Sequence, residues 1–201
     1  MTIPQLLLFI IARFFPDAVF YKPTQDQRVA LTIDDAPTPG VLGEESTEQL
    51  LAAIAQQHQQ FNRDQTGVRG TFFIITEHLR ENSTIIEQIL QQGHEIANHG
   101  IRDRQTSDLS RELFEKDFQE ADEKLLRLSH YPIRWCRLGR AFYNQIMLDI
   151  LRQFGGYEPR FALASMIPLD TFKLTNHPKF TTWYVSQFIF SGAILVLHSG
   201  S

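Results

Sequence analysis

Short apolar runs rich in β-branched and aromatic residues alternate along this chain with longer amphipathic segments, and this alternation constrains the fold more than any other feature. Residues 28–33 and 70–75 have the composition of buried strands, and residues 44–59 between them have the apolar period of a helix. Consecutive units of this kind imply parallel strands that are covered by helices.

The same alternation continues along the rest of the sequence. The further segments that we predict are helices at 82–92, 110–128 and 142–154, and strands at 95–98, 133–137, 161–165 and 193–197. Five or six strand–helix units in 201 residues predict an α/β fold with a mostly parallel sheet, either open or closed into a barrel. No low-complexity linker interrupts the pattern, so we expect one domain over residues 25–201.

Composition and charge exclude some function classes. The 19 basic and 23 acidic side chains are spread along the chain and give a net charge of -4, so there is no basic stripe for nucleic acid. The lone cysteine, Cys136, cannot form an internal disulfide, which weakly favours a cytoplasmic or membrane-surface location over a secreted one. Protein partners and oligomeric state stay open.

Residues 1–24 precede the first predicted strand and form a segment of their own. Their apolar run, residues 6–12, ends at Arg13 and is well short of the roughly 18 to 20 residues that a membrane span requires. No Lys or Arg stands before the run, as one would in a signal peptide. We expect this segment to dock on the domain or to lie on a membrane surface, without crossing the bilayer.

Polar residues suited to chemistry gather after the predicted strands. In chain order they are Asp34, Asp35, His99, Asp103, Arg137 and His198. Active sites of parallel α/β folds lie where the strands end. Two adjacent carboxylates repel each other unless a positive group lies beside them, and imidazole with carboxylate oxygen suits zinc and related divalent ions. The pattern therefore predicts a divalent-metal site with an open position for water.

Five motifs in register carry a resemblance to a known family. The segments LTIDDAP (31–37), GTFF (70–73) and GHEIANH (93–99) are followed by Arg137 and by LVLH (195–198). In order and strand context they resemble the polysaccharide deacetylases of the NodB-homology type, carbohydrate esterase family 4. The resemblance implies a distorted (β/α) barrel with one divalent metal ion, which removes N-acetyl groups from amino sugars of chitin, chitooligosaccharides or peptidoglycan.

The resemblance also implies a role for each of these residues. Asp34 matches the general base, and Arg137 matches the arginine that orients the base carboxylate. Asp35 and His99 match two ligands of the metal. His198 matches the acid that protonates the departing amine.

Three departures from the family pattern accompany these matches. Asp103 stands where the family has its second histidine ligand, so we expect Asp35, His99 and Asp103 to hold one ion. Zinc is the expected ion, and the added carboxylate makes cobalt, manganese or another divalent ion the alternatives. The prolines and glycine after Arg137 are replaced, and the fourth motif keeps only Asp170, which we expect to tune the catalytic histidine.

These inferences predict a metal-dependent hydrolase of non-peptide carbon–nitrogen bonds that deacetylates an N-acetylated glycan, with Trp135 lining the pocket. Three alternatives remain. The same site could cleave an O-acetyl ester, or the protein could be a catalytically silent carbohydrate-binding or scaffold protein, since the third and fourth motifs are altered. The third alternative is an α/β module that binds a small metabolite without metal. The sequence ends three residues after His198, where the family usually continues, so a truncated domain is a further alternative.

Overall fold

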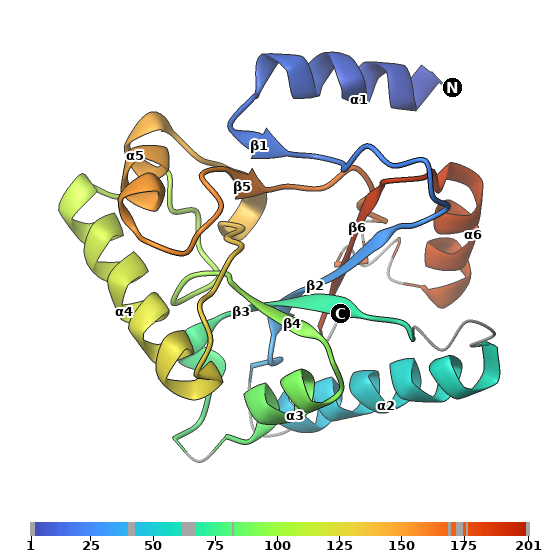
Figure 1. Ribbon diagram of the computed structural model, residues 1–201, viewed down its shortest axis with the longest axis horizontal. Coiled ribbons are helices and arrows are strands. Elements are labelled where there is room, and N and C mark those ends of the chain that lie inside the picture. The colour runs from blue at the N-terminus through green and yellow to red at the C-terminus, as the bar shows by residue number, and fades with distance from the viewer. Residues whose placement is uncertain are drawn as a thin grey trace.

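A parallel four-stranded sheet forms the centre of the molecule (Figure 1). The computed structural model describes residues 3–39, 43–61, 67–81, 83–168, 170–171, 175 and 177–199. The sheet has the order β4-β3-β2-β6, and its strands are β2 (Ala30–Ala36), β3 (Gly70–Ile74), β4 (Glu95–Asn98) and β6 (Ile194–His198). Leu31 pairs with Gly70 on one side and with Leu195 on the other, so β2 lies inside the sheet. The predicted α/β class with parallel strands is confirmed.

Helices surround these strands (Figure 1). They are α1 (Ile3–Phe14), α2 (Gly43–Phe61), α3 (Ile85–Gln91), α4 (Arg111–Ser129), α5 (Gln145–Gln153) and α6 (Pro178–Phe188), with short 3-10 helices η1 (Thr76–His78) and η2 (Gly139–Ala141). Ser110 begins α4 by accepting a hydrogen bond from the Leu113 amide, which satisfies one of the free N–H groups of the first turn.

The largest buried cluster joins one face of the sheet to the helices beside it. Ile33 of β2 and Phe72 of β3 contribute to it from the sheet, and Leu51 of α2, Ile86 of α3 and Leu125 of α4 contribute from the helices. All five side chains are at most 1% exposed. Replacing one of them with alanine removes buried apolar area and leaves a cavity, at a cost of about 2–5 kcal/mol. This packing holds the strands whose ends carry the polar residues.

An irregular segment closes the sheet on itself. The predicted strand at 133–137 is wrong as a regular strand, because only one bridge, between Cys136 and Asn98, joins it to β4. The predicted strand at 161–165 is reduced to β5 (Phe161–Ala162), which pairs with β1 (Ala18–Val19) outside the four-stranded sheet. The amide of Ala162 nevertheless donates to the Cys136 carbonyl, and the amide of Met166 donates to Ile194 of β6. Residues 161–166 thus complete a ring of strands, which agrees with a distorted barrel.

The N-terminal helix lies along the outside of this ring (Figure 1). Phe9 of α1 contacts Tyr21 with ring centroids 4.6 Å apart, whereas Leu7, Ile10 and Phe14 on the other side of the helix are exposed. None of the described helices combines the length and apolar character needed to cross a bilayer. Membrane-surface contact of residues 1–24 therefore stays a prediction.

Candidate active site

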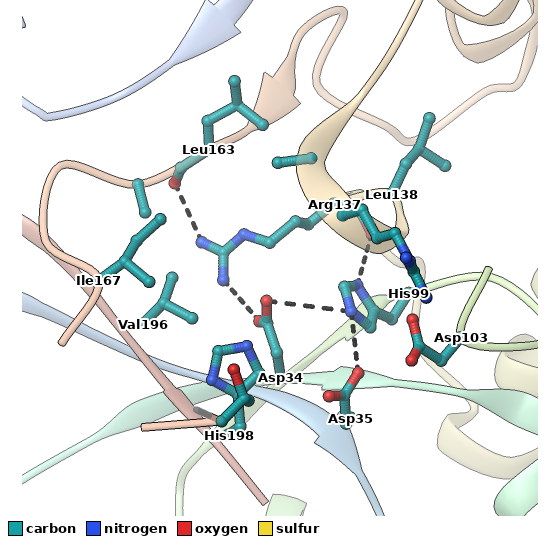
Figure 2. Close-up of a pocket in the computed structure, with 14 residues that line it drawn as sticks. Asp34, Asp35, His99, Asp103, Arg137, Leu138, Leu163, Ile167, Val196 and His198 are labelled. Atoms are coloured by element: carbon teal, nitrogen blue, oxygen red, sulfur yellow. Dashed lines mark hydrogen bonds and ion pairs between the residues drawn. The ribbon is translucent and has the colours of Figure 1, made fainter. Parts of the chain in front are cut away.

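The predicted catalytic residues meet in one pocket at the carboxyl ends of the parallel strands (Figure 2). The pocket has a volume of about 500 Å³. Six of its lining residues are Asp34, Asp35, His99, Asp103, Arg137 and His198. They come from β2, from the segments after β4 and Cys136, and from β6, so strands distant in sequence deliver them to the same edge.

Asp34 and Arg137 form a buried ion pair at the base of the pocket. Arg137 Nη1 donates to Asp34 Oδ1 at 2.6 Å, and the two side chains are 3% and 8% exposed. Asp34 lies in register with His198 of β6, which places the ends of both strands at the same level. The geometry brings the predicted base carboxylate and its predicted orienting arginine into direct contact.

The rest of the Arg137 guanidinium is held by the barrel. It donates to Thr32 Oγ1 at 2.8 Å, to the Ala162 carbonyl at 2.9 Å and to the Leu163 carbonyl at 3.0 Å. The group also lies 4.1 Å from the centre of the Phe73 ring, a cation–π contact. No role was predicted for Thr32 or for these carbonyl groups, which fix the arginine in one orientation.

Asp35 lies in direct contact with His99 in the pocket. Asp35 Oδ1 and His99 Nε2 are 3.3 Å apart, and the His99 Nε2 to Asp34 Oδ2 distance is 3.9 Å. Burial raises the pKa of Asp35, but the hydrogen bond and charge of His99, together with the charges of His198 and His78, lower that pKa below its ordinary value. Burial lowers the pKa of His99, but Asp34, Asp35 and the bond to the Arg137 carbonyl together raise that pKa above its ordinary value. The arrangement of Asp34, Asp35 and His99 therefore favours the binding of a positive charge.

Hydrogen bonds to His99 and to the turn that carries it fix the orientation of its ring. Its Nδ1 donates to the Arg137 carbonyl at 2.6 Å, so in the neutral imidazole the lone pair lies on Nε2, toward Asp35. The buried Asn98 side chain accepts from the Gly100 amide at 2.7 Å and donates to the Tyr157 hydroxyl at 3.0 Å. That hydroxyl donates in turn to Asp122 at 2.7 Å. These bonds support the turn that carries His99, and sequence reasoning missed them.

Asp103 lies on the same side of the pocket as Asp35 and His99 (Figure 2). Its side chain is exposed. Within the described residues, no three His, Cys, Asp or Glu side chains lie close enough together to hold a metal ion. Asp35 and His99 therefore form the part of the predicted ligand set that the structure brings together, and ligation by Asp103 stays a prediction.

His198 is anchored by Asp170 through two contacts. The backbone amide of His198 donates to Asp170 Oδ2 at 2.9 Å, and His198 Nδ1 lies 2.7 Å from Asp170 Oδ1. Burial lowers the pKa of His198, but the hydrogen bond and charge of Asp170, together with the charges of Asp34 and Asp35, raise that pKa above its ordinary value. Asp170 is thus in the position from which it was expected to tune the histidine.

Trp135 does not line the pocket, contrary to the sequence-based expectation. It packs half-buried against Phe73, Ala97 and Ala162 inside the ring of strands. Two residues of extended chain carry it about 6.6 Å back from Arg137, away from the strand ends.

A second hollow of about 340 Å³ adjoins the pocket and contains a histidine that the sequence analysis did not single out. His78 lines this hollow together with Asp35, Asp103 and His198. Its Nδ1 lies 2.8 Å from the Pro37 carbonyl. No motif surrounds His78, so its place beside the site follows only from the fold.

The arrangement can support hydrolysis. A carboxylate aimed by an arginine can accept a proton from water, and an imidazole held by a carboxylate can donate one to a leaving group. The Asp35–His99 pair offers oxygen and nitrogen donors to a divalent ion. The chemistry of this donor set fits the expected metal, and Asp103 is the predicted third ligand.

Comparison with known proteins places the chain among glycan-modifying enzymes. A protein-family profile for polysaccharide deacetylase matches residues 21–158. A peptidoglycan-N-acetylglucosamine deacetylase of Bacillus cereus is 30% identical over 183 residues, which cover 89% of this chain and 75% of that protein. A chitooligosaccharide deacetylase of Rhizobium leguminosarum bv. trifolii is 24% identical over 103 residues, which cover 51% of this chain and 41% of that protein.

Solved structures share the fold. A mutant, with restored enzymatic activity, of a CE4 family pseudoenzyme superposes with a TM-score of 0.76 at 22% identity. The wild-type form of that pseudoenzyme is from Bacillus anthracis. The match to the mutant covers 92% of this chain and 61% of the other, so this chain spans about three fifths of that structure.

Proposed function

The chain belongs to the polysaccharide deacetylase family of hydrolases, and we propose that it removes the N-acetyl group of an N-acetylated glycan with the help of a divalent metal ion. The observation that carries the proposal is the convergence of three pairs on one pocket: Asp34 with Arg137, Asp35 with His99, and His198 with Asp170. Relatives named as peptidoglycan-N-acetylglucosamine and chitooligosaccharide deacetylases support a glycan substrate.

In this proposal Asp34 is the general base. Its Oδ1 accepts a hydrogen bond from Arg137, and its Oδ2 lies 3.9 Å from His99 Nε2. Oδ2 is therefore the oxygen that takes the proton of the attacking water. Arg137 is a positioning residue, because its four hydrogen bonds leave it no freedom to follow the substrate.

His198 is the general acid that protonates the departing amine nitrogen. Amines leave from the intermediate of amide hydrolysis only when they are protonated, so a group that carries a proton near neutral pH is required. Asp170 raises the pKa of His198 and so keeps the proton on the imidazole to higher pH. Asp170 acts through His198 and is therefore a positioning residue.

Asp35, His99 and Asp103 would hold the metal. A divalent ion at such a site supplies Lewis acidity toward the acetyl carbonyl oxygen and makes water a better nucleophile at neutral pH. His99 is prepared for this role, since its bond to the Arg137 carbonyl directs Nε2 toward Asp35. Asp103 offers a carboxylate from the pocket wall.

An acetate-release assay tests the proposal. Chitooligosaccharides, peptidoglycan fragments and acetylated xylan are incubated with chelator-treated protein, with and without added zinc, cobalt or manganese. We expect metal-dependent release from an N-acetylated glycan and its loss in Asp34→Asn. Release from acetylated xylan alone would instead identify an O-acetyl esterase. A folded, metal-loaded protein that releases acetate from none of the three would overturn the proposal in favour of a silent binding protein.

A further inference from the structure

The pocket contains two arginines that differ in their surroundings. Arg137 is buried and donates four hydrogen bonds within the barrel. Arg140 lines the same pocket with an exposed side chain, and no hydrogen bond or ion pair joins it to any residue that the structure describes. A guanidinium group in that position is available to a ligand.

The acidic residues of the pocket do not use Arg140 for charge balance. Asp34 is paired with Arg137, and Asp35 is paired with His99. Asp103 also lines the pocket, yet no ion pair joins it to Arg140 among the described contacts. The positive charge of Arg140 therefore has no structural counterpart in the described part of the wall.

The backbone holds Arg140 at the pocket by an unfavourable turn. Arg140 has φ 60° and ψ 10°, and Ala141 has φ 59°, so two successive residues with side chains adopt the left-handed region. The Ala141 amide donates to the Leu138 carbonyl at 2.9 Å. A Cβ at Gly139 would lie 2.7 Å from the Arg104 carbonyl oxygen, so the turn packs directly against that backbone. Strain that is retained at a pocket wall points to a function.

We propose that Arg140 determines specificity by binding a carboxylate of the glycan, so that the preferred substrate is an acidic N-acetylated glycan. The inference rests on the proposed deacetylase function and narrows its substrate class. A guanidinium group donates two parallel N–H bonds to a carboxylate, which fixes the orientation of the sugar that bears it. Apolar Leu163, Ala164 and Ile167 line the same pocket and suit the acetyl methyl group and the sugar face.

Two kinds of sugar supply such a carboxylate, namely the lactyl ether of a muramic acid and a uronic acid. The test therefore compares three tetrasaccharides of equal length: chitotetraose, which is neutral, an N-acetylglucosamine–N-acetylmuramic acid tetrasaccharide, and a tetrasaccharide of alternating N-acetylglucosamine and glucuronic acid. The measured quantity is the ratio of kcat/KM for each acidic substrate to kcat/KM for chitotetraose. The arm with the higher ratio identifies the source of the carboxylate.

Arg140→Gln keeps the length and polarity of the side chain and removes its charge. We expect the larger ratio to fall about 10-fold to 100-fold, the loss typical of a hydrogen bond to a charged partner. Arg140→Lys, which keeps the charge without the planar fork, should lose part of the preference. Arg127→Gln is the matched control, because Arg127 is exposed on α4 and does not line the pocket.

Binding provides a readout that does not depend on turnover. Titration calorimetry on Asp34→Asn and on Asp34→Asn/Arg140→Gln gives the affinity for each tetrasaccharide. We expect the acidic preference in the first protein only, and we expect salt to weaken it, since an exposed charge pair is screened.

The outcomes separate the two proposals. If the wild type releases no acetate from any glycan, the deacetylase proposal fails, and the calorimetry still decides the role of Arg140. Equal affinity of Asp34→Asn, the variant that keeps Arg140, for acidic and neutral tetrasaccharides would overturn the inference. So would a fall in kcat/KM by the same factor on all substrates in Arg140→Gln, because that pattern belongs to general charge balance in the pocket.

Discussion

Asp34 and Asp35 are consecutive in the chain, yet both side chains enter the same pocket (Figure 2). Neighbouring residues of a regular strand point to opposite faces of the sheet. Asp35 departs from that rule because its φ is 60°, and the register between β2 and β3 shifts between Ile33 and Ala36. Aspartate and asparagine occupy the left-handed region more readily than most residues, so the type of residue at position 35 suits its conformation.

This geometry predicts different losses for two similar substitutions. Asp34→Asn removes the proton acceptor and should lower kcat about 100-fold to 10,000-fold while the bound metal is kept. Asp35→Asn keeps the left-handed backbone and removes a metal ligand, so the metal content should fall. Elemental analysis and acetate release measure both effects.

Circular dichroism controls for the fold of the two variants. If both proteins keep their metal and their activity, the division of roles between the two aspartates is wrong. If both lose metal equally, Asp34 is a ligand as well.

The contact between Asp170 and His198 predicts a pH effect. Asp170 raises the pKa of His198, so removing its charge in Asp170→Asn should lower that pKa. The general acid acts in its protonated form, and activity falls as pH rises through its pKa. The alkaline limb of the kcat profile should therefore move to lower pH in Asp170→Asn.

Asp149→Asn serves as a control for this measurement, because Asp149 accepts a hydrogen bond from Gln145 on α5 and does not line the pocket. An alkaline limb that stays in place in Asp170→Asn, with activity otherwise intact, would assign the limb to another group.

The hydroxyl of Tyr157 predicts a stability effect that reaches the metal site. Tyr157→Phe leaves the buried Asn98 side chain without an acceptor for its N–H group and should destabilise the fold by about 1–3 kcal/mol. Because Asn98 also holds the Gly100 amide, the turn that carries His99 should loosen and metal affinity should fall. Urea denaturation and metal titration measure the two effects.

Tyr143→Phe is the matched control, since the Tyr143 hydroxyl makes no hydrogen bond with the described residues. Equal stability and metal affinity in Tyr157→Phe and the wild type would mean that the network does not support the site.

Asp103 allows a test of the third ligand. Asp103→Ala should weaken metal binding, and Asp103→His should shift preference toward zinc, because imidazole suits zinc better than harder ions. Competition titrations with zinc, cobalt and manganese measure affinity and preference. Identical affinity and preference in the wild type and both variants would show that Asp103 is a wall residue only.

The strand and helix segments of the sheet could be predicted because their signals are local. Apolar runs locate β2, β3, β4 and β6, and β2, β3 and β4 pack against α2, α3 and α4. The segment 133–137 has a similar composition but forms a single bridge, between Cys136 and Asn98. Barrel closure is a long-range property that no short window of sequence contains.

The sequence-based prediction did not include helix α6. Its residues include Thr181, Thr182, Trp183, Tyr184 and Val185, which favour strands. The helix instead begins with His177, whose side chain accepts from the Lys179 amide, followed by Pro178 in the first turn. The proline was the available signal, and local propensity opposed it.

Some residues of the site could also be predicted from the sequence, and others could not. Asp34, His99, Arg137 and His198 stand in recognisable motifs at strand ends, and the structure brings them together. No role was predicted for Thr32, His78 or Tyr157, because their contacts with the site come from residues far away in sequence. Trp135 shows the limit of strand alternation, which gives the face of a side chain but not its depth in the barrel.

The pairing of β2 with β6 also fixes an order of assembly during synthesis. Thr32 donates to the Leu195 carbonyl across 163 residues, so this side of β2 stays unpaired in a nascent chain until β6 has been made. An open strand edge invites pairing with other chains, and contacts of such sequence separation form slowly. His198 arrives with the same strand. A partly synthesised chain therefore exposes this strand edge before it carries a complete catalytic centre.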